Sequence, residues 1–206
     1  MDLAFENNLR GQGHEFIAGI DEAGRGPLAG PVAAAAVIFN FKEIPAELEP
    51  IRDSKKLTAK KREELFELII KNSAGYGIGL CDHEIIDRVN ILQATFLAMK
   101  KALGNLKVKP NIILLDGNLP LPNYSSPQQS IINGDQLIFS IAAASILAKV
   151  TRDRIMNRMH EQYPKYFFIK HKGYGTKMHL DALKLYGPCE IHRKTFKPIK
   201  SYFKSP

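Results

Sequence analysis

One stretch near the N-terminus sets out the first elements of the fold, and it reads Gly19-Ile20-Asp21-Glu22-Ala23-Gly24-Arg25-Gly26-Pro27-Leu28-Ala29-Gly30-Pro31. Two adjacent carboxylates, Asp21 and Glu22, stand at the end of a short apolar run that begins at Phe16. A turn rich in glycine and proline follows, and a second apolar run occupies residues 32–39. Short apolar runs bounded by glycine and proline are typical of β-strands. The connection is too tight for a crossover helix, so these two strands are predicted to be antiparallel.

Acidic side chains at the mouth of a buried strand need compensation, because burial disfavours their charged form. A divalent cation is the usual compensation, since hard cations take oxygen ligands. Glycines in the neighbouring turn let another backbone approach closely, and the guanidinium of Arg25 suits a phosphate. The acids, the glycines and the arginine together predict a metal-dependent site that acts on a phosphodiester.

Composition and charge narrow the class of protein. The 206 residues are 45% hydrophobic and 24% charged, which are ordinary globular values. We therefore expect a single catalytic domain over residues 1–206, with a core at about 14–160 and a C-terminal helical extension at about 161–206. The net charge of +8 favours an anionic partner, most often nucleic acid, although a basic surface with no such role is the alternative.

The cysteines and the apolar runs bear on localisation. Only two cysteines occur, Cys81 and Cys189, which fits a reduced compartment and no structural zinc. The N-terminus is polar and unlike a signal peptide. No apolar run approaches the roughly 20 residues of a membrane helix. We expect a cytoplasmic protein that makes no membrane contact.

The hydrophobic pattern predicts strands that alternate with helices. Strands are expected at 16–21, 32–39, 76–80, 111–115 and 129–132, and helices at 59–72, 83–103, 137–160 and from Thr176 to Gly187. This order indicates an α/β fold with a mixed central sheet flanked by helices.

Two further acids also stand at the ends of predicted elements. Asp116 comes directly after the strand at 111–115, and Asp135 precedes the helix at 137–160. Ligand-binding groups gather at the carboxyl ends of strands in α/β sheets, so these acids can converge with Asp21 and Glu22. Two unit charges about 4 Å apart repel by roughly 4 kcal/mol at an effective dielectric of about 20. One or two Mg²⁺ or Mn²⁺ ions would balance that repulsion.

Each acid also has an ordinary structural interpretation. Asp21 could be a turn-forming aspartate, Asp116-Gly117 is a common hairpin dipeptide, and Asp135 could simply cap the helix that follows. The metal interpretation gains strength because all three occur in one chain beside the glycine-arginine turn.

Several blocks together resemble a known family. They are the stretch from Asp21 to Pro31, Asp53-Ser54-Lys55-Lys56-Leu57, Leu115-Asp116-Gly117, Gly134-Asp135, the run from Ser140 to Asp153, His171-Lys172-Gly173-Tyr174-Gly175-Thr176 and His192-Arg193. In this order, over about residues 16–198, they resemble type 2 ribonuclease H (ribonuclease HII). The glycine-arginine-glycine turn differs from the glycine-threonine-glycine turn of the type 3 relatives.

The resemblance implies an RNase H-like fold, cleavage of the RNA strand in RNA–DNA hybrids, and incision 5′ of ribonucleotides embedded in duplex DNA. The products would carry 3′-hydroxyl and 5′-phosphate ends. It implies that the four acids Asp21, Glu22, Asp116 and Asp135 hold catalytic Mn²⁺ or Mg²⁺. It further implies that Gly24, Arg25 and Gly26 contact the ribose 2′-hydroxyl and its phosphate, and that Tyr174 stacks near that sugar.

The tyrosine and the lysine pair have alternatives of their own. Tyr174 could be a packed aromatic between flexible glycines, although the nearby basic residues favour contact with nucleic acid. Lys55 and Lys56 form either a solvated charge pair or a grip on phosphate.

Two rival functions remain at this point. One is a different metal nuclease or strand-transfer enzyme on a similar fold, which would share the acids but not the glycine-arginine-glycine turn or Tyr174. The other is a non-catalytic module that binds hybrid duplexes. Four acids would repel the phosphates of such a ligand, so they favour an enzyme, which we expect to act as a monomer.

Overall fold

The computed structural model describes residues 1–203, apart from the side chains of residues 52–55. Its centre is a five-stranded sheet in the order β3-β2-β1-β4-β5. The strands are β1 (Ile17–Ala23), β2 (Val32–Ile38), β3 (Gly75–Cys81), β4 (Ile112–Asp116) and β5 (Gln128–Ile131). β1 and β2 pair antiparallel, as do β2 and β3, whereas β4 pairs parallel with both β1 and β5. The predicted mixed sheet and the antiparallel first pair are confirmed.

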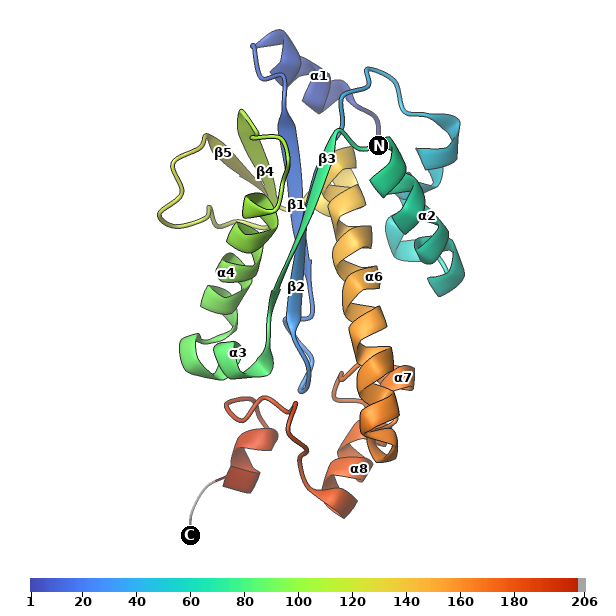
Figure 1. Ribbon diagram of the computed structural model, residues 1–206, viewed down its shortest axis with the longest axis vertical. Helices are drawn as coiled ribbons and strands as arrows, with labels where there is room; N and C mark the ends of the chain where they lie inside the picture. Colours follow the sequence, from blue (N-terminus) through green and yellow to red (C-terminus); the bar gives the residue numbers. More distant parts are fainter. Residues whose placement is uncertain (204–206) are drawn as a thin grey trace.

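Helices cover both faces of this sheet (Figure 1). They are α1 (Ala4–Gly11), α2 (Ala59–Asn72), α3 (His83–Val89), α4 (Ile91–Gly104), α5 (Gly134–Leu137), α6 (Phe139–Gln162), α7 (Phe168–His171) and α8 (Lys177–Tyr186), with 3₁₀ turns η1 (Ala46–Lys56), η2 (Pro164–Tyr166) and η3 (Ile199–Phe203). Within the described residues no helix is long and apolar enough to cross a membrane.

The side chains of β2 divide between two hydrophobic cores, because successive residues of a strand point to opposite faces. Ala35 and Val37 belong to the core beneath α2 and α6, whereas Ala34 and Ala36 belong to the core beneath α4. The small side chains of these alanines thus let a helix pack closely on each face of the sheet.

Glycines allow the same close packing on the neighbouring strands. A Cβ on Gly79 would overlap the carbonyl oxygen of Ala98 in α4, and a Cβ on Gly19 would overlap the backbone at Ser140 in α6. Larger residues there would force a helix away from the sheet.

The helix expected over residues 83–103 is two helices, so that prediction is wrong in its continuity. Asn90 has a φ of +68° and separates α3 from α4. Its side-chain oxygen accepts a hydrogen bond from the amide of Gln93 and so caps α4. Asparagine tolerates the left-handed region and favours helix caps, which explains the break within a continuous apolar stripe.

Helix α6 receives its N-terminal cap from a distant segment. Its own cap position, Ile138, offers no side-chain hydrogen bond. Instead, one carboxylate oxygen of Glu6 in α1 accepts hydrogen bonds from the amide and the hydroxyl of Ser140, each at 3.1 Å. The carboxylate compensates the positive end of the α6 dipole and joins the N-terminal segment to the central helix.

Residues 164–203 form a C-terminal layer at one end of the sheet, below α3 and α6 in Figure 1. Three histidines lie buried in it. The Nε2 atoms of His179 and His192 are 3.0 Å apart, and the rings of His171 and His179 stack with centroids 4.5 Å apart. Burial is the main cause that lowers the pKa of His179 and that of His192 to about 4. Both imidazoles are therefore neutral in the folded protein at neutral pH.

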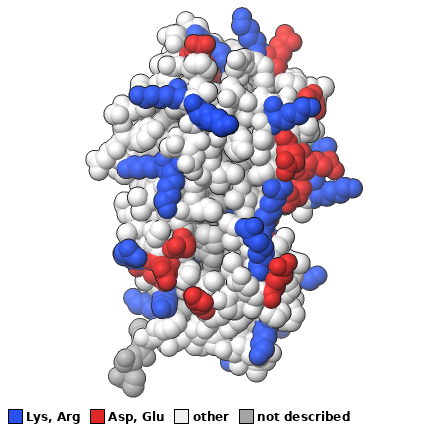
Figure 2. Space-filling view, viewed as in Figure 1, with Lys and Arg blue, Asp and Glu red and all other residues white. Residues whose placement is uncertain are grey.

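One face of the molecule carries charged side chains of both signs. On the face shown in Figure 2, Lys and Arg are interspersed with Asp and Glu rather than gathered into one basic patch. The net positive charge therefore does not by itself locate a binding site.

Replacement of the distant cap is expected to destabilise the protein. Glu6→Ala leaves the buried amide and hydroxyl of Ser140 without their acceptor, so the free energy of unfolding should fall by about 1–3 kcal/mol. Urea unfolding at pH 7.5 measures the loss. Glu6→Gln, which retains an acceptor oxygen, should cost less, and equal losses in both variants would contradict the capping role.

The buried histidines predict a loss of stability in mild acid. In the unfolded chain histidines titrate near pH 6.5, so below that pH the unfolded state takes up protons that the folded layer excludes. The stability of the layer is complete above about pH 6.5 and declines as the pH falls toward about 4. Urea midpoints measured between pH 8 and pH 4.5 test this dependence. His179→Gln should flatten it, whereas His14→Gln, outside this layer, should leave it unchanged.

Candidate active site

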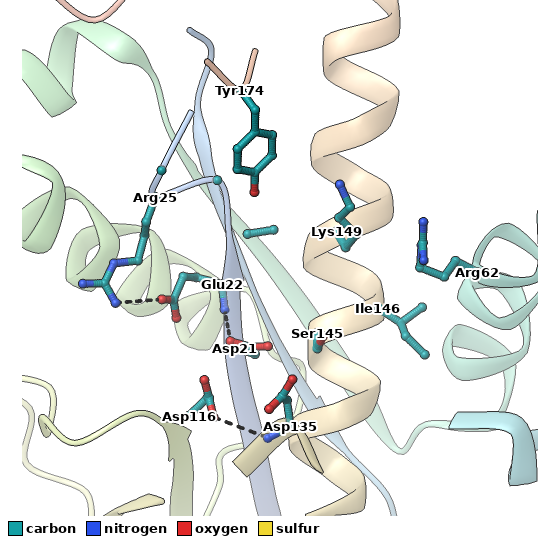
Figure 3. Close-up of a pocket in the computed structure, with 13 residues that line it drawn as sticks. Asp21, Glu22, Arg25, Arg62, Asp116, Asp135, Ser145, Ile146, Lys149 and Tyr174 are labelled. Carbon is teal, nitrogen blue, oxygen red and sulfur yellow. Dashed lines mark hydrogen bonds and ion pairs between the residues drawn. The ribbon is translucent and has the colours of Figure 1, made fainter. Parts of the chain in front are cut away.

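A cavity of about 440 Å³ opens at the carboxyl ends of β1 and β4. It is lined by Asp21, Glu22, Ala23, Gly24, Arg25, Gly26, Arg62, Asp116, Asp135, Ser145, Ile146, Lys149 and Tyr174. Figure 3 shows the acidic side chains along one side of this space and the basic side chains of α2 and α6 across it. The pocket thus brings together residues from six separate parts of the chain.

The parallel pairing of β1 with β4 brings the first acids together. Ile20 lies opposite Leu115 in the ladder, so Asp21 and Asp116 follow directly on paired residues. Parallel strands end at the same edge of a sheet, which is where ligand-binding groups collect in α/β folds. The pairing of these two strands therefore brings together two acids that lie 95 positions apart in the sequence.

Asp135 reaches the same edge from the start of α5. The residue before this helix, Asn133, lies in the left-handed region with a φ of +55°, which turns the chain sharply after β5. The backbone amide of Asp135 then lies 3.4 Å from the Oδ1 atom of Asp116. Asp135 is buried at the edge of the pocket rather than acting only as a solvent-exposed cap.

The acids raise one another's proton affinity. Asp21 is only 7% exposed, and burial together with the charges of Glu22 and Asp116 raises its pKa well above the usual value. Burial also raises the pKa of Glu22, although the Arg25 guanidinium opposes that shift. Arg25 Nη1 donates to Glu22 Oε1 at 3.1 Å. A buried carboxylate that destabilises the fold is typical of a functional site.

The donor set suits a hard divalent cation. Every acidic group in the pocket offers oxygen, and no histidine or cysteine lines it. Among the residues that the structure describes, no three His, Cys, Asp or Glu side chains are arranged to hold an ion as they stand. Ligation by these side chains would therefore need the carboxylates to turn toward one another, whereas the Oε2 atom of Glu22 takes no part in the pair with Arg25. The chemistry of the donors fits a cation, while their final geometry depends on binding.

The glycine-arginine-glycine turn forms the rim of the pocket next to the acids. Gly24 has a φ of +102°, a conformation that glycine adopts without strain. A Cβ on Gly26 would lie 3.7 Å from the ring of Tyr174, so the turn and the tyrosine are neighbours. Tyr174 is 45% exposed, and Figure 3 shows its hydroxyl directed toward the acids. The ring is therefore available to a ligand and is not buried as a packed aromatic.

Of the lysine pair expected to grip phosphate, only the side chain of Lys56 is described by the structure. The side chain of Lys55 lies outside the part of the chain that the structure describes, and Lys56 does not line the cavity. Lys149 from α6 and Arg62 from α2 line it instead. Lys149 Nζ donates to Asp153 Oδ1 at 2.7 Å, and Arg62 Nη1 donates to the carbonyl of Leu57 at 2.6 Å.

Sequence reasoning missed Arg62 as a pocket residue. The only signal was its place in a basic run at the start of α2, and such a run usually faces solvent. Its position depends on how α2 packs beside α6, which no local pattern encodes.

Removal of one buried acid is expected to stabilise the protein. Asp21→Asn eliminates a buried charge beside three other carboxylates, so in chelator at pH 7.5 the melting temperature should rise by at least about 3 °C, the shift that roughly 1 kcal/mol produces in a chain of this size. Differential scanning calorimetry measures it. Asp181→Asn, on exposed α8, is the matched control and should show no rise.

The same variant tests cation binding without any activity measurement. Mn²⁺ at about 100 times its Kd should stabilise the wild type by about 2.7 kcal/mol and Asp21→Asn by much less. Equal stabilisation of both proteins by Mn²⁺ would refute this carboxylate set as the ligands.

Comparison with known proteins agrees with this site. The model of the family "Ribonuclease HII" matches residues 18–199. Ribonuclease HII of Caldicellulosiruptor bescii is 56% identical over 191 residues, which are 93% of this chain and 91% of the relative. Ribonuclease HII of Acholeplasma laidlawii is 53% identical over 203 residues, 98% of each chain.

Solved structures show the same fold. Ribonuclease H2 from Pyrococcus horikoshii OT3 superposes with a TM-score of 0.75 at 29% identity, covering 90% of this chain and 96% of that one. RNase HII in the PCNA:RNase HII complex from Archaeoglobus fulgidus gives a TM-score of 0.74 at 26% identity, covering 88% and 95%. The RNase H-like fold is therefore confirmed. The chain belongs to the ribonuclease HII family and is a metal-dependent endoribonuclease that acts on the RNA of RNA–DNA hybrids.

Proposed function

We propose that this enzyme also incises duplex DNA on the 5′ side of single embedded ribonucleotides, leaving 3′-hydroxyl and 5′-phosphate ends. One observation carries the proposal: the Gly24–Gly26 turn and the Tyr174 hydroxyl lie at the rim of the pocket that the four acids line. A site that read only the shape of a long hybrid would not need polar groups gathered around one sugar.

The ribose 2′-hydroxyl is the group that distinguishes RNA from DNA at a given position. Selective binding needs a donor and an acceptor at hydrogen-bond distance from that oxygen. The backbone of the Gly24–Gly26 turn offers amides, and the Tyr174 hydroxyl offers both functions. In this proposal the turn reads the 2′-hydroxyl, and the exposed ring of Tyr174 stacks against the sugar.

The carboxylates of Asp21, Glu22, Asp116 and Asp135 are proposed to hold Mg²⁺ or Mn²⁺. When bound, such cations supply the positive charge that activates a water nucleophile and stabilises the departing 3′-oxygen. The protein orients the scissile phosphate between these acids and the basic side chains across the pocket. Arg25, Lys149 and Arg62 are the groups placed to contact phosphate oxygens there.

Lys55 and Lys56 are proposed to act farther along the duplex. Since Lys56 lies outside the pocket lining, a phosphate that Lys56 grips would belong to a nucleotide beyond the scissile group. Such contacts strengthen binding of any duplex and carry no information about the sugar.

The whole chain is proposed to function as one catalytic unit and as a monomer. The acids come from the core at about 14–160, whereas Tyr174 comes from the C-terminal extension at about 161–206. Neither part alone contains both the cation-binding groups and the aromatic platform.

The decisive substrate is a DNA duplex with a single internal ribonucleotide. In Mg²⁺ or Mn²⁺ the wild type should cut once, on the 5′ side of the ribonucleotide, and chelator should stop the reaction. Asp116→Asn should lower kcat at least about a thousandfold, because several kcal/mol of transition-state stabilisation are lost. Tyr174→Phe, which keeps the ring and removes the hydroxyl, should lower kcat/KM for this substrate about fivefold to tenfold. Gel analysis with end-labelled strands measures the position and rate of cutting.

An exposed aspartate provides the matched control, and Asp181→Asn should leave the rate unchanged. Cutting of an all-DNA duplex at a similar rate would refute the reading of ribose and favour a general metal nuclease. Tight binding of the duplex with no cleavage in either cation would favour a non-catalytic binding module. Cutting of long hybrids alone would refute incision at single ribonucleotides.

A further inference from the structure

One buried guanidinium collects the carbonyl groups of the glycine-arginine-glycine turn. Arg193 Nη2 donates to the carbonyl oxygen of Gly24 at 2.6 Å, and its Nη1 donates to that of Arg25 at 3.0 Å. Its Nε donates to the carbonyl of Gly30 at 3.0 Å, and Nη2 also reaches that of Pro31 at 3.2 Å. One side chain therefore binds both ends of the turn, from 162 to 169 positions away in sequence.

Burial of the charged Arg193 side chain costs free energy of folding, and that cost indicates a specific use. Arg193 is fully buried, and among the described residues no carboxylate forms an ion pair with it. Burial is the main cause that lowers its pKa to about 9, and it stays charged at neutral pH. A buried charge is tolerated only when its hydrogen bonds are satisfied. Here the satisfying groups are carbonyls of the turn, so the charge and the shape of the turn depend on each other.

The backbone segment that carries Arg193 is itself held by two neighbours. In α3, the carboxylate of Asp87 accepts hydrogen bonds from the amides of Lys194 and Thr195 at 2.8 and 2.9 Å, and from the Thr195 hydroxyl at 2.6 Å. The backbone amide of Arg193 donates to the carbonyl of Leu28 at 2.9 Å. The segment that carries the arginine is thus fixed to α3 on one side and to the turn on the other.

A second buried arginine connects the turn to the segment of Tyr174. Arg152 of α6 donates from Nε to the carbonyl of Pro31 at 2.9 Å and from Nη2 to that of Ala29 at 3.1 Å. Its Nη1 donates to the carbonyl of Lys172 at 2.9 Å, two residues before Tyr174. Both arginines donate to the carbonyl of Pro31, whereas among the described residues only Arg193 donates a side-chain hydrogen bond to the carbonyls of Gly24 and Arg25.

Because of peptide geometry, the hydrogen bonds from Arg193 also fix the opposite side of the turn. A trans peptide unit is planar and points its N–H away from its C=O. Since Arg193 fixes the carbonyls of Gly24 and Arg25, it also fixes the N–H groups of Arg25 and Gly26, which belong to the same two peptide units. Those N–H groups point away from Arg193, and both residues line the pocket.

We propose that Arg193 is a positioning residue for recognition of the ribose: it sets the direction of the Arg25 and Gly26 amides. The inference rests on the proposed function, because it assumes that this turn reads the 2′-hydroxyl. It adds that discrimination against deoxyribose depends on the C-terminal segment around residue 193, which does not line the pocket of the acids. Arg193 acts through the turn and is not a catalytic residue.

The test compares Arg193→Lys and Arg193→Gln with the wild type. Lysine keeps the charge but lacks the planar fork that spans four carbonyls, so both variants should loosen the turn. Amide hydrogen exchange of residues 25 and 26 should become at least about tenfold faster in both. On the single-ribonucleotide duplex, kcat/KM should fall about a hundredfold, the usual effect of a misplacement near 1 Å. Stabilisation by Mn²⁺ should be unchanged, because the acids do not contact Arg193.

Two controls separate positioning from general loss of stability. Tyr166→Phe removes the hydrogen bond from the Tyr166 hydroxyl to the carbonyl of Gly187 in the same C-terminal layer, away from the turn. Arg154→Lys makes the same chemical change at an arginine whose partners are Glu63 and Glu67. Neither control should speed exchange at residues 25 and 26 or alter the preference for a ribonucleotide.

The possible results of the exchange and cleavage measurements lead to different conclusions. Unchanged exchange at residues 25 and 26 in Arg193→Gln would overturn the positioning role, whatever the enzyme cuts. Faster exchange with an unchanged preference for ribonucleotide over all-DNA duplex would overturn the link to ribose recognition. A wild type that ignores single ribonucleotides would refute the proposed function, and the exchange measurement would still decide whether Arg193 holds the turn.

Discussion

The central strand β1 imposes the constraint on which the rest of the molecule depends. It pairs antiparallel with β2 on one side and parallel with β4 on the other. The parallel pairing brings Asp116 beside Asp21, and the antiparallel pairing returns the chain through a turn that stays next to both. A shift of one residue in either register would turn each side chain to the opposite face of the sheet. The pocket and the sheet are therefore specified by the same hydrogen bonds.

Ionisable side chains are buried on both sides of the turn, which costs electrostatic free energy. On one side, burial and neighbouring acids raise the pKa of Asp21. On the other side, Arg152 and Arg193 are buried with backbone carbonyls as their partners. Each group would be destabilising in isolation. In the proposed function the acids would hold a cation, and the arginines would keep the turn in one shape through its carbonyls.

The C-terminal layer packs against the segment that follows the glycine-arginine-glycine turn. Leu28 and Ala29 of the turn belong to the same hydrophobic core as Phe168 and Ile199. The buried histidines add a polar network within this layer, and the backbone at His192 pairs with that at Ala29 in an isolated antiparallel bridge. His179 and His192 both lie inside the layer, although no local spacing in the sequence relates them to their partners.

The sequence by itself determined the strands, the mixed sheet and the acids that line the pocket, because these depend on local periodicity and on carboxylates placed at strand ends. The glycine-arginine-glycine turn and the helix at Thr176 were likewise readable from residue types with strong local preferences. The cap by Glu6, the place of Arg62 and the grip of Arg193 were decided only by tertiary structure. Each of these three joins groups far apart in the chain, and a single residue carries no record of its distant partner. At Asn90, the apolar stripe continued through the break and gave no sign of it.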